Sequence, residues 1–243
     1  MGLHTADAIV LRRYPFRETS VTLTVLTDRH GKLKGLVKGL RAQPNRYRSA
    51  MEPATVNRIV FYDTHTSQLH LISQCELLAD LPELQQDLDT ARIASFCLEL
   101  TDTVVPLNEP QPGSYRLLKH TLERLAVRGT GDREALRMHF ILRLLRLAGF
   151  HPQLDECTGC GGLVHEQGYW SAKQGGLLCV KCLHEDPKAE PTRPELLAAL
   201  EQLAEADDLP ALKSPITAAL SQRLNEFLHW RLDRPLKTLA NLE

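Results

Sequence analysis

Apolar and polar residues alternate along short stretches of the first eighty positions. In residues 20–27, Val21, Leu23 and Val25 alternate with Thr22 and Thr24, as in a strand with one buried and one wet face. Similar β-rich runs occupy residues 8–11, 33–38, 55–62 and 68–73, and turn-forming clusters separate them. The pattern predicts five strands that form a small antiparallel barrel or sandwich.

After residue 82 the apolar residues recur every three or four positions, which is the period of a helix. We predict helices over residues 84–105, 114–128, 132–148, 192–206 and 215–230. Asp132 is a plausible N-cap of the third, and Thr192 with Glu195 forms a possible capping box for the fourth. The chain is therefore expected to be of the α+β class, with strands first and helices afterwards.

Charge is distributed unevenly along the 243 residues. The whole chain has a formal net charge of −1, yet residues 1–60 carry eleven Lys and Arg against four Asp and Glu, a net charge of +7. This asymmetry predicts an anion-binding head on a neutral to acidic body.

The sequence contains no run of about 18 apolar residues, the minimum for a membrane span. Its start also lacks the apolar stretch of a signal peptide. We therefore expect a soluble cytoplasmic protein, where six cysteines do not need to form disulfides.

Four of these cysteines form two CxxC pairs, Cys157 with Cys160 and Cys179 with Cys182. Two such turns, eighteen residues apart, are typical of a tetrahedral four-thiolate zinc site. The sequence predicts one structural zinc ion. A thioredoxin-like redox pair is the alternative, but it requires a parallel βαβ unit that the pattern does not predict. Cys75 and Cys97 lie in apolar surroundings and are expected to be buried.

The segment from residue 32 to residue 48 has no acidic residue. We predict that it binds nucleic-acid phosphates, with Tyr14, Phe16 and Tyr47 as candidate stacking platforms for bases. A solvated charged surface is the alternative for the cations, and Tyr14 and Phe16 would also suit a barrel core. The proposed DNA-binding residues are Lys32, Lys34, Lys38, Arg41, Arg46, Tyr47 and Arg48.

No phosphate-binding loop, dinucleotide fingerprint, zinc-protease motif or hydrolase elbow occurs in the sequence. We therefore expect a binding protein and not an enzyme.

Four local motifs stand out along the chain. They are residues 8–11 (Ala-Ile-Val-Leu), 108–110 (Asn-Glu-Pro), 115–118 (Tyr-Arg-Leu-Leu) and 149–152 (Gly-Phe-His-Pro), the last of which leads into the first CxxC pair. With these motifs the chain resembles the RecO family of bacterial DNA-repair proteins. The resemblance implies an OB-fold at residues 1–80, a helical domain at residues 81–150 and 191–243, and an embedded zinc module at residues 151–190.

The same resemblance implies a non-enzymatic role in recombinational repair, in the cytoplasm and close to the nucleoid. Members of the family bind single- and double-stranded DNA, anneal complementary strands and, with RecR, help to load RecA onto DNA coated by single-strand-binding protein. A zinc-bearing RNA- or transcription-associated module and a thiol enzyme are the alternative hypotheses.

The resemblance also implies a surface for the acidic tail of single-strand-binding protein. Such a peptide needs cations for its carboxylates and an apolar pocket for its last side chain. We predict that the helices provide both, although a plain amphipathic bundle with a solvated basic face would have the same pattern. The candidate cations are Arg116, Lys119, Arg137 and Arg143.

Overall fold

The computed structural model describes residues 2–39, 51–64, 69–127, 133–164, 168–205, 212 and 214–242. The chain forms two compact units, Met1–Thr130 and Gly131–Asn241. The first unit thus joins the barrel to the two helices that follow it, and each unit has its own core.

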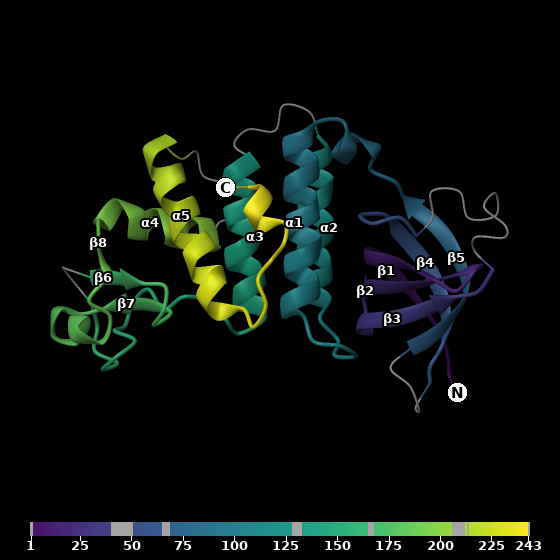
Figure 1. Ribbon diagram of the computed structural model, residues 1–243, viewed down its shortest axis with the longest axis horizontal. Helices are drawn as coiled ribbons and strands as arrows, with labels where there is room; N and C mark the ends of the chain where they lie inside the picture. The colour runs from purple at the N-terminus through teal and green to yellow at the C-terminus, as the bar shows by residue number, and fades with distance from the viewer. Residues whose placement is uncertain are drawn as a thin grey trace. The chain divides into compact units, whose positions relative to one another are not determined.

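The first unit contains the strands first and the helices afterwards (Figure 1). Its elements are β1 (Leu3–Phe16), β2 (Ser20–Thr27), β3 (Gly31–Val37), β4 (Val56–Tyr62), β5 (Leu69–Ala79), the short 3₁₀ helix η2 (Pro82–Gln85), α1 (Leu88–Val104) and α2 (Pro112–Ala126).

The five strands close into a barrel in the order β1-β2-β3-β5-β4, with β4 paired to β1. Strand β3 runs parallel to β5, and the other pairs are antiparallel. This closed five-stranded arrangement is OB-like. The prediction of a small barrel followed by helices is confirmed, and the parallel β3–β5 pair is a detail that the sequence pattern did not predict.

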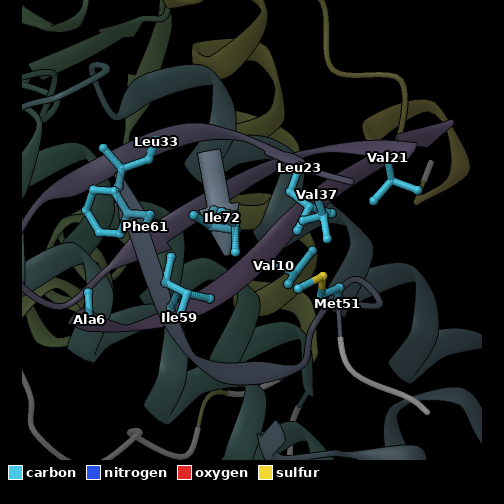
Figure 2. Packing of buried hydrophobic residues seen from close by; sticks show 12 residues of the cluster. Ala6, Val10, Val21, Leu23, Leu33, Val37, Met51, Ile59, Phe61 and Ile72 are labelled. Carbon is cyan, nitrogen blue, oxygen red and sulfur yellow. The ribbon is translucent and has the colours of Figure 1, made fainter. Parts of the chain in front are cut away.

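Alternate residues of the strands fill the barrel, as Figure 2 shows. Fully burying an aliphatic side chain of this kind contributes about 1.5–3 kcal/mol to stability. Glycine at position 35 leaves room for the Ile72 side chain, because a Cβ at position 35 would lie 2.3 Å from Cδ1 of Ile72. The labelled core residues are Ala6, Val10, Val21, Leu23, Leu33, Val37, Met51, Ile59, Phe61 and Ile72.

Ion pairs join the barrel to α1. Arg12 Nε lies 2.6 Å from Asp102 Oδ2, and a second Arg12 nitrogen lies 3.6 Å from Glu99 Oε1. Lys32 Nζ lies 3.4 Å from Asp102 Oδ1 and also donates to the Asp102 backbone carbonyl. The Lys32 and Asp102 side chains are only 8% and 12% exposed, so their charges neutralise each other away from bulk water.

The loop after α1 crosses the turn between β2 and β3. The Asn108 amide donates to the Lys32 carbonyl at 2.9 Å, and Asn108 itself has a φ of 61°, a conformation that asparagine tolerates better than most residues. A Cβ on Gly31 would lie 1.8 Å from the Glu109 carbonyl oxygen. The positive φ thus gives a physical reason for asparagine at position 108, and the close approach of the Glu109 backbone gives one for glycine at position 31.

The second unit combines helices with a small sheet of order β7-β6-β8. Leu200, Leu203, Leu220, Leu224 and Phe227 are completely buried in its helical part. Its elements are α3 (Arg133–Leu147), β6 (Gly168–Ser171), β7 (Gly176–Leu178), η3 (Val180–Glu185), β8 (Glu190–Thr192), α4 (Pro194–Glu205), α5 (Ser214–Arg231) and η4 (Leu239–Asn241).

Two predicted helix starts are wrong. The first helix begins at Leu88, because the Asp87 carboxylate accepts a hydrogen bond from the Thr90 amide at 2.9 Å and caps it. Thr192 ends β8 and does not cap α4, since its hydroxyl accepts a hydrogen bond from Arg223 at 3.0 Å. Asp132 lies outside the described residues.

Among the helices that the structure describes, none has both the length and the apolar character that a membrane crossing requires.

The ion pairs between the barrel and α1 lead to a stability prediction. Asp102→Ala leaves the buried Lys32 ammonium without its carboxylate, so we expect the free energy of unfolding in urea to fall by about 3 kcal/mol. Lys119→Gln is the control, because Lys119 and Glu123 form an exposed pair at 3.8 Å whose loss costs about 0.5 kcal/mol or less. Equal losses in the two variants would contradict this assignment.

Candidate metal centre and nucleic-acid interface

The four CxxC cysteines meet in the second unit. Cys157 and Cys160 lie in the turn that precedes the sheet, Cys179 comes just before η3, and Cys182 lies within it. Their four Sγ atoms all lie within 4.8 Å of one another. The predicted four-cysteine cluster is confirmed, and its donors could hold one metal ion.

Backbone hydrogen bonds shape the first CxxC turn. The Cys157 amide donates to the Gly162 carbonyl, and the Gly161 amide donates back to the Cys157 carbonyl, both at 2.8 Å. Gly161 has a φ of +70°, which glycine adopts without strain. The Thr158 amide donates to the Leu177 carbonyl at 2.8 Å, so the turn is tied to the strand that leads into the second pair.

The same backbone favours the thiolate form of Cys157. Burial alone would raise the pKa of this thiol, but amides of Cys179, Cys160 and Gly159 lower it, and the resulting pKa is about 6. The Cys179 amide lies 3.3 Å from the Cys157 sulfur. A thiolate is the form that binds a metal.

The sulfur separation also suits a metal site. Tetrahedral coordination with metal–sulfur bonds of about 2.3 Å places two sulfurs about 3.8 Å apart. The Sγ atoms of Cys160 and Cys179 are 3.8 Å apart. The donor set and its geometry therefore fit a closed, structural thiolate site.

The remaining two cysteines lie elsewhere. Cys97 is completely buried on α1. Cys75 lies on β5, where burial raises the pKa of its thiol to about 12. The expectation of burial holds for Cys97, whereas Cys75 is half-buried and its thiol donates to Asn57 Oδ1 at 3.3 Å.

Two of the predicted phosphate-binding lysines point outward from β3 and its end. Leu33 and Val37 face the barrel core, so Lys34, between them, faces the other way and is exposed, and so is Lys38. No carboxylate of the described residues lies within ion-pairing distance of either lysine. They form an exposed, positively charged edge on the outer face of β3.

The prediction that Lys32 binds DNA is wrong. Its side chain is buried and paired with Asp102, so it contributes to stability and not to an anion-binding surface. The charge pattern of residues 32–48 does not reveal its partners on α1, although the spacing of Glu99 and Asp102 places two carboxylates on one face of that helix. Arg41, Arg46, Tyr47 and Arg48 lie outside the described residues, and their roles stay predictions.

Other arginines of the head also have carboxylate partners. Arg58 Nε lies 2.9 Å from Asp7 Oδ1, and Arg29 Nε lies 3.2 Å from Asp28 Oδ2. Arg13 pairs with Glu52. These three carboxylates are already counted in the net charge of +7 for residues 1–60, so the pairs leave that net charge unchanged and show only that the three arginines each face a carboxylate.

The structure distinguishes the two candidate stacking residues of β1. Tyr14 is 51% exposed, so it is not a core residue. Phe16 is half-buried, and the Arg17 guanidinium lies over its ring at 5.3 Å from the centroid. Of these two residues, Tyr14 is the one whose aromatic ring is exposed to solvent.

The candidate partner residues occupy different environments. The prediction for Arg137 is wrong, because its side chain is 1% exposed and donates to Glu134, Asn225 and Ser221. Arg116 is exposed on α2, and Lys119 pairs with Glu123.

Arg143 is half-buried and donates to the carbonyls of Ala204 and Glu205 at the end of α4, both at 3.4 Å. It therefore helps to hold α3 against α4. Its role at a partner surface, like those of Arg116 and Lys119, stays a prediction.

Comparisons with known proteins cover both units. The family model described as recombination protein O N terminal matches residues 1–80, and the model described as recombination protein O C terminal matches residues 85–240. The DNA repair protein RecO of Desulforudis audaxviator is 32% identical over 249 residues, which span 100% of this chain and 97% of that protein.

Two further relatives are also DNA repair proteins named RecO. The DNA repair protein RecO of Pelotomaculum thermopropionicum is 33% identical over 75% of this chain and 70% of its own length. That of Symbiobacterium thermophilum is 28% identical over 100% of this chain and 98% of its own length. The similarity therefore extends over the barrel, the helices and the cysteine cluster.

Proposed function

Because this chain belongs to the RecO family of DNA-repair proteins, we propose that it serves recombinational repair as a non-enzymatic DNA-binding protein. It binds single- and double-stranded DNA and brings complementary strands together. The observation that carries this proposal is the exposed pair Lys34 and Lys38 on the outer face of an OB-like barrel, the face with which such barrels commonly bind oligonucleotides.

Exposed lysines on the outer face of a strand bind the phosphate backbone and do not read base edges. Affinity then depends little on base sequence and strongly on salt. If the same surface neutralises two strands, it lowers their mutual repulsion and leaves the base edges free to pair. Annealing follows from that charge neutralisation and needs no nucleotide hydrolysis.

Family membership also supports a set of protein partners. We propose that the chain associates with RecR, recognises the acidic tail of single-strand-binding protein and helps RecA to load onto coated DNA. Arg116, Lys119 and Arg143 are the candidate cations for the tail. We place the protein in the cytoplasm, near the nucleoid.

We assign zinc to the four-cysteine cluster. Four thiolates in tetrahedral geometry favour zinc over hard, oxygen-binding cations. When bound, zinc would join the two CxxC turns and stabilise a segment with a small apolar core of its own. The role is structural, because four protein ligands leave no open coordination position.

The zinc assignment predicts a metal content that depends on particular cysteines. We expect one zinc per chain in protein purified without chelator, and Cys157→Ser should abolish stoichiometric zinc binding as measured by inductively coupled plasma mass spectrometry. Cys75→Ser is the matched control and should keep its zinc, because this cysteine lies on β5. Zinc-free wild-type protein, or full zinc in Cys157→Ser, would contradict the assignment.

The DNA assignment predicts a smaller salt dependence after charge reversal. Each phosphate neutralised on a single strand contributes about −0.7 to the slope of log affinity against log salt. Lys34→Glu with Lys38→Glu should therefore flatten that slope by about 1.4, as measured by fluorescence anisotropy with an oligonucleotide of mixed sequence. The rate of strand annealing without nucleotide should fall in parallel.

The control reverses two exposed lysines of the second unit, Lys173 and Lys237. That variant should keep the wild-type slope and annealing rate. A folded Lys34/Lys38 variant with wild-type slope and annealing would show that DNA binds to another surface.

A further inference from the structure

A one-residue bulge decides which side chains of β1 face outward. Ala6, Ala8 and Val10 face the barrel core, and Val10 pairs with Val25. The register shifts between Val10 and Arg12. If the alternation had continued without this shift, Tyr14 would also point into the core.

The shift places Tyr14 on the outer face instead. Arg12 lies opposite Thr24 and Tyr14 lies opposite Thr22, while Leu23, between these two threonines, faces the core. Bulges of this kind often re-aim side chains next to functional sites. The aromatic ring is therefore presented to solvent by a specific backbone irregularity.

The hydroxyl of this tyrosine is anchored. Arg12 donates from Nη1 to the Tyr14 hydroxyl at 3.1 Å, and its Nε is held 2.6 Å from Asp102 on α1. A ring fixed at its hydroxyl loses less conformational freedom when a ligand stacks on it. The ring thus combines 51% exposure with a restrained orientation.

Positive charge lies two strands away from the ring. Thr22 pairs with Leu36, and Thr24, which is itself buried, pairs with Lys34, so β2 separates Tyr14 from the two exposed lysines. Two strand spacings of about 4.8 Å place β3 about 10 Å from β1. A nucleic-acid backbone that follows Lys34 and Lys38 can direct its bases across β2 towards Tyr14.

We infer that Tyr14 is a stacking platform for one unpaired base, with Arg12 as its positioning residue, and that it favours single-stranded over duplex DNA. This inference rests on the proposed DNA-binding function. It adds the residue that makes the protein favour single-stranded over duplex DNA. In a duplex, neighbouring base pairs cover both faces of an internal base, whereas an unpaired base can offer its π-face to an aromatic ring.

The test compares Tyr14→Leu and Tyr14→Phe with a matched control, Tyr62→Leu. Tyr62 is a second exposed tyrosine of the same barrel, at the end of β4. The ligands are oligo-dT and a blunt-ended duplex of two complementary strands, each titrated over the same series of salt concentrations. Loss of one stacked base corresponds to about 1–3 kcal/mol, so Tyr14→Leu should weaken oligo-dT binding about tenfold and leave duplex binding and the salt slope unchanged.

Tyr14→Phe keeps the ring but loses the hydroxyl that Arg12 holds, so it should weaken oligo-dT binding to the same modest extent as Arg12→Lys and less than Tyr14→Leu. Tyr62→Leu should bind like the wild type. Irradiation of an oligonucleotide containing 5-iododeoxyuridine should cross-link Tyr14 in the wild-type protein. Arg12→Lys should weaken oligo-dT binding in the presence of the Tyr14 hydroxyl and have little further effect in Tyr14→Phe. Such non-additivity indicates that Arg12 acts through this ring.

The outcomes separate the two proposals. If the wild type binds no DNA at low salt, the proposed function itself fails. If the wild type binds but Tyr14→Leu has the same preference for oligo-dT, or loses both ligands equally, the stacking platform is refuted and the phosphate-binding function stands. Additive effects of Arg12→Lys and Tyr14→Phe would refute the positioning role of Arg12.

Discussion

The carboxylate of Asp102 determines how the positive charges of the head are used. A lysine can be buried only when its charge is paired, because an isolated ammonium in the interior costs several kcal/mol (about 3–5 when its partner is removed). Asp102 supplies that partner for Lys32 and holds Arg12 at the same time. The barrel and α1 are thereby fixed against each other, Lys34 and Lys38 remain on the surface, and Arg12 is positioned to reach Tyr14.

Much of the fold could be predicted from the sequence because it depends on local patterns. The alternation in residues 20–27 coincides with β2, Ser20–Thr27, and the two CxxC pairs gather as their spacing indicates. Binding residues were harder to predict from the number of charged residues alone, because such a count ignores ion pairs within the protein. Lys32 and Arg137 were predicted to lie on binding surfaces, but both are buried. The outward position of Tyr14 depends on a single-residue register shift, which leaves no mark in a hydrophobic pattern.

The barrel and the cysteine module are stabilised by different interactions. The barrel has a large apolar core, which Figure 2 shows, and ion pairs to α1. The cysteine module has a small buried cluster around Cys157, Leu178 and Cys182, so a metal–thiolate bond contributes proportionally more there. The proposed DNA-binding surface lies in the first unit and the proposed metal site in the second, so we expect that a change in one need not unfold the other.

The central claim is that the outer face of β1, β2 and β3 is the DNA surface, and hydrogen–deuterium exchange of the full chain tests it most directly. We expect a single-stranded oligonucleotide at low salt to slow exchange in residues 12–24 and 33–38, while residues 157–182 keep their rate. Slower exchange confined to residues 131–241, with no change in the barrel, would contradict the claim.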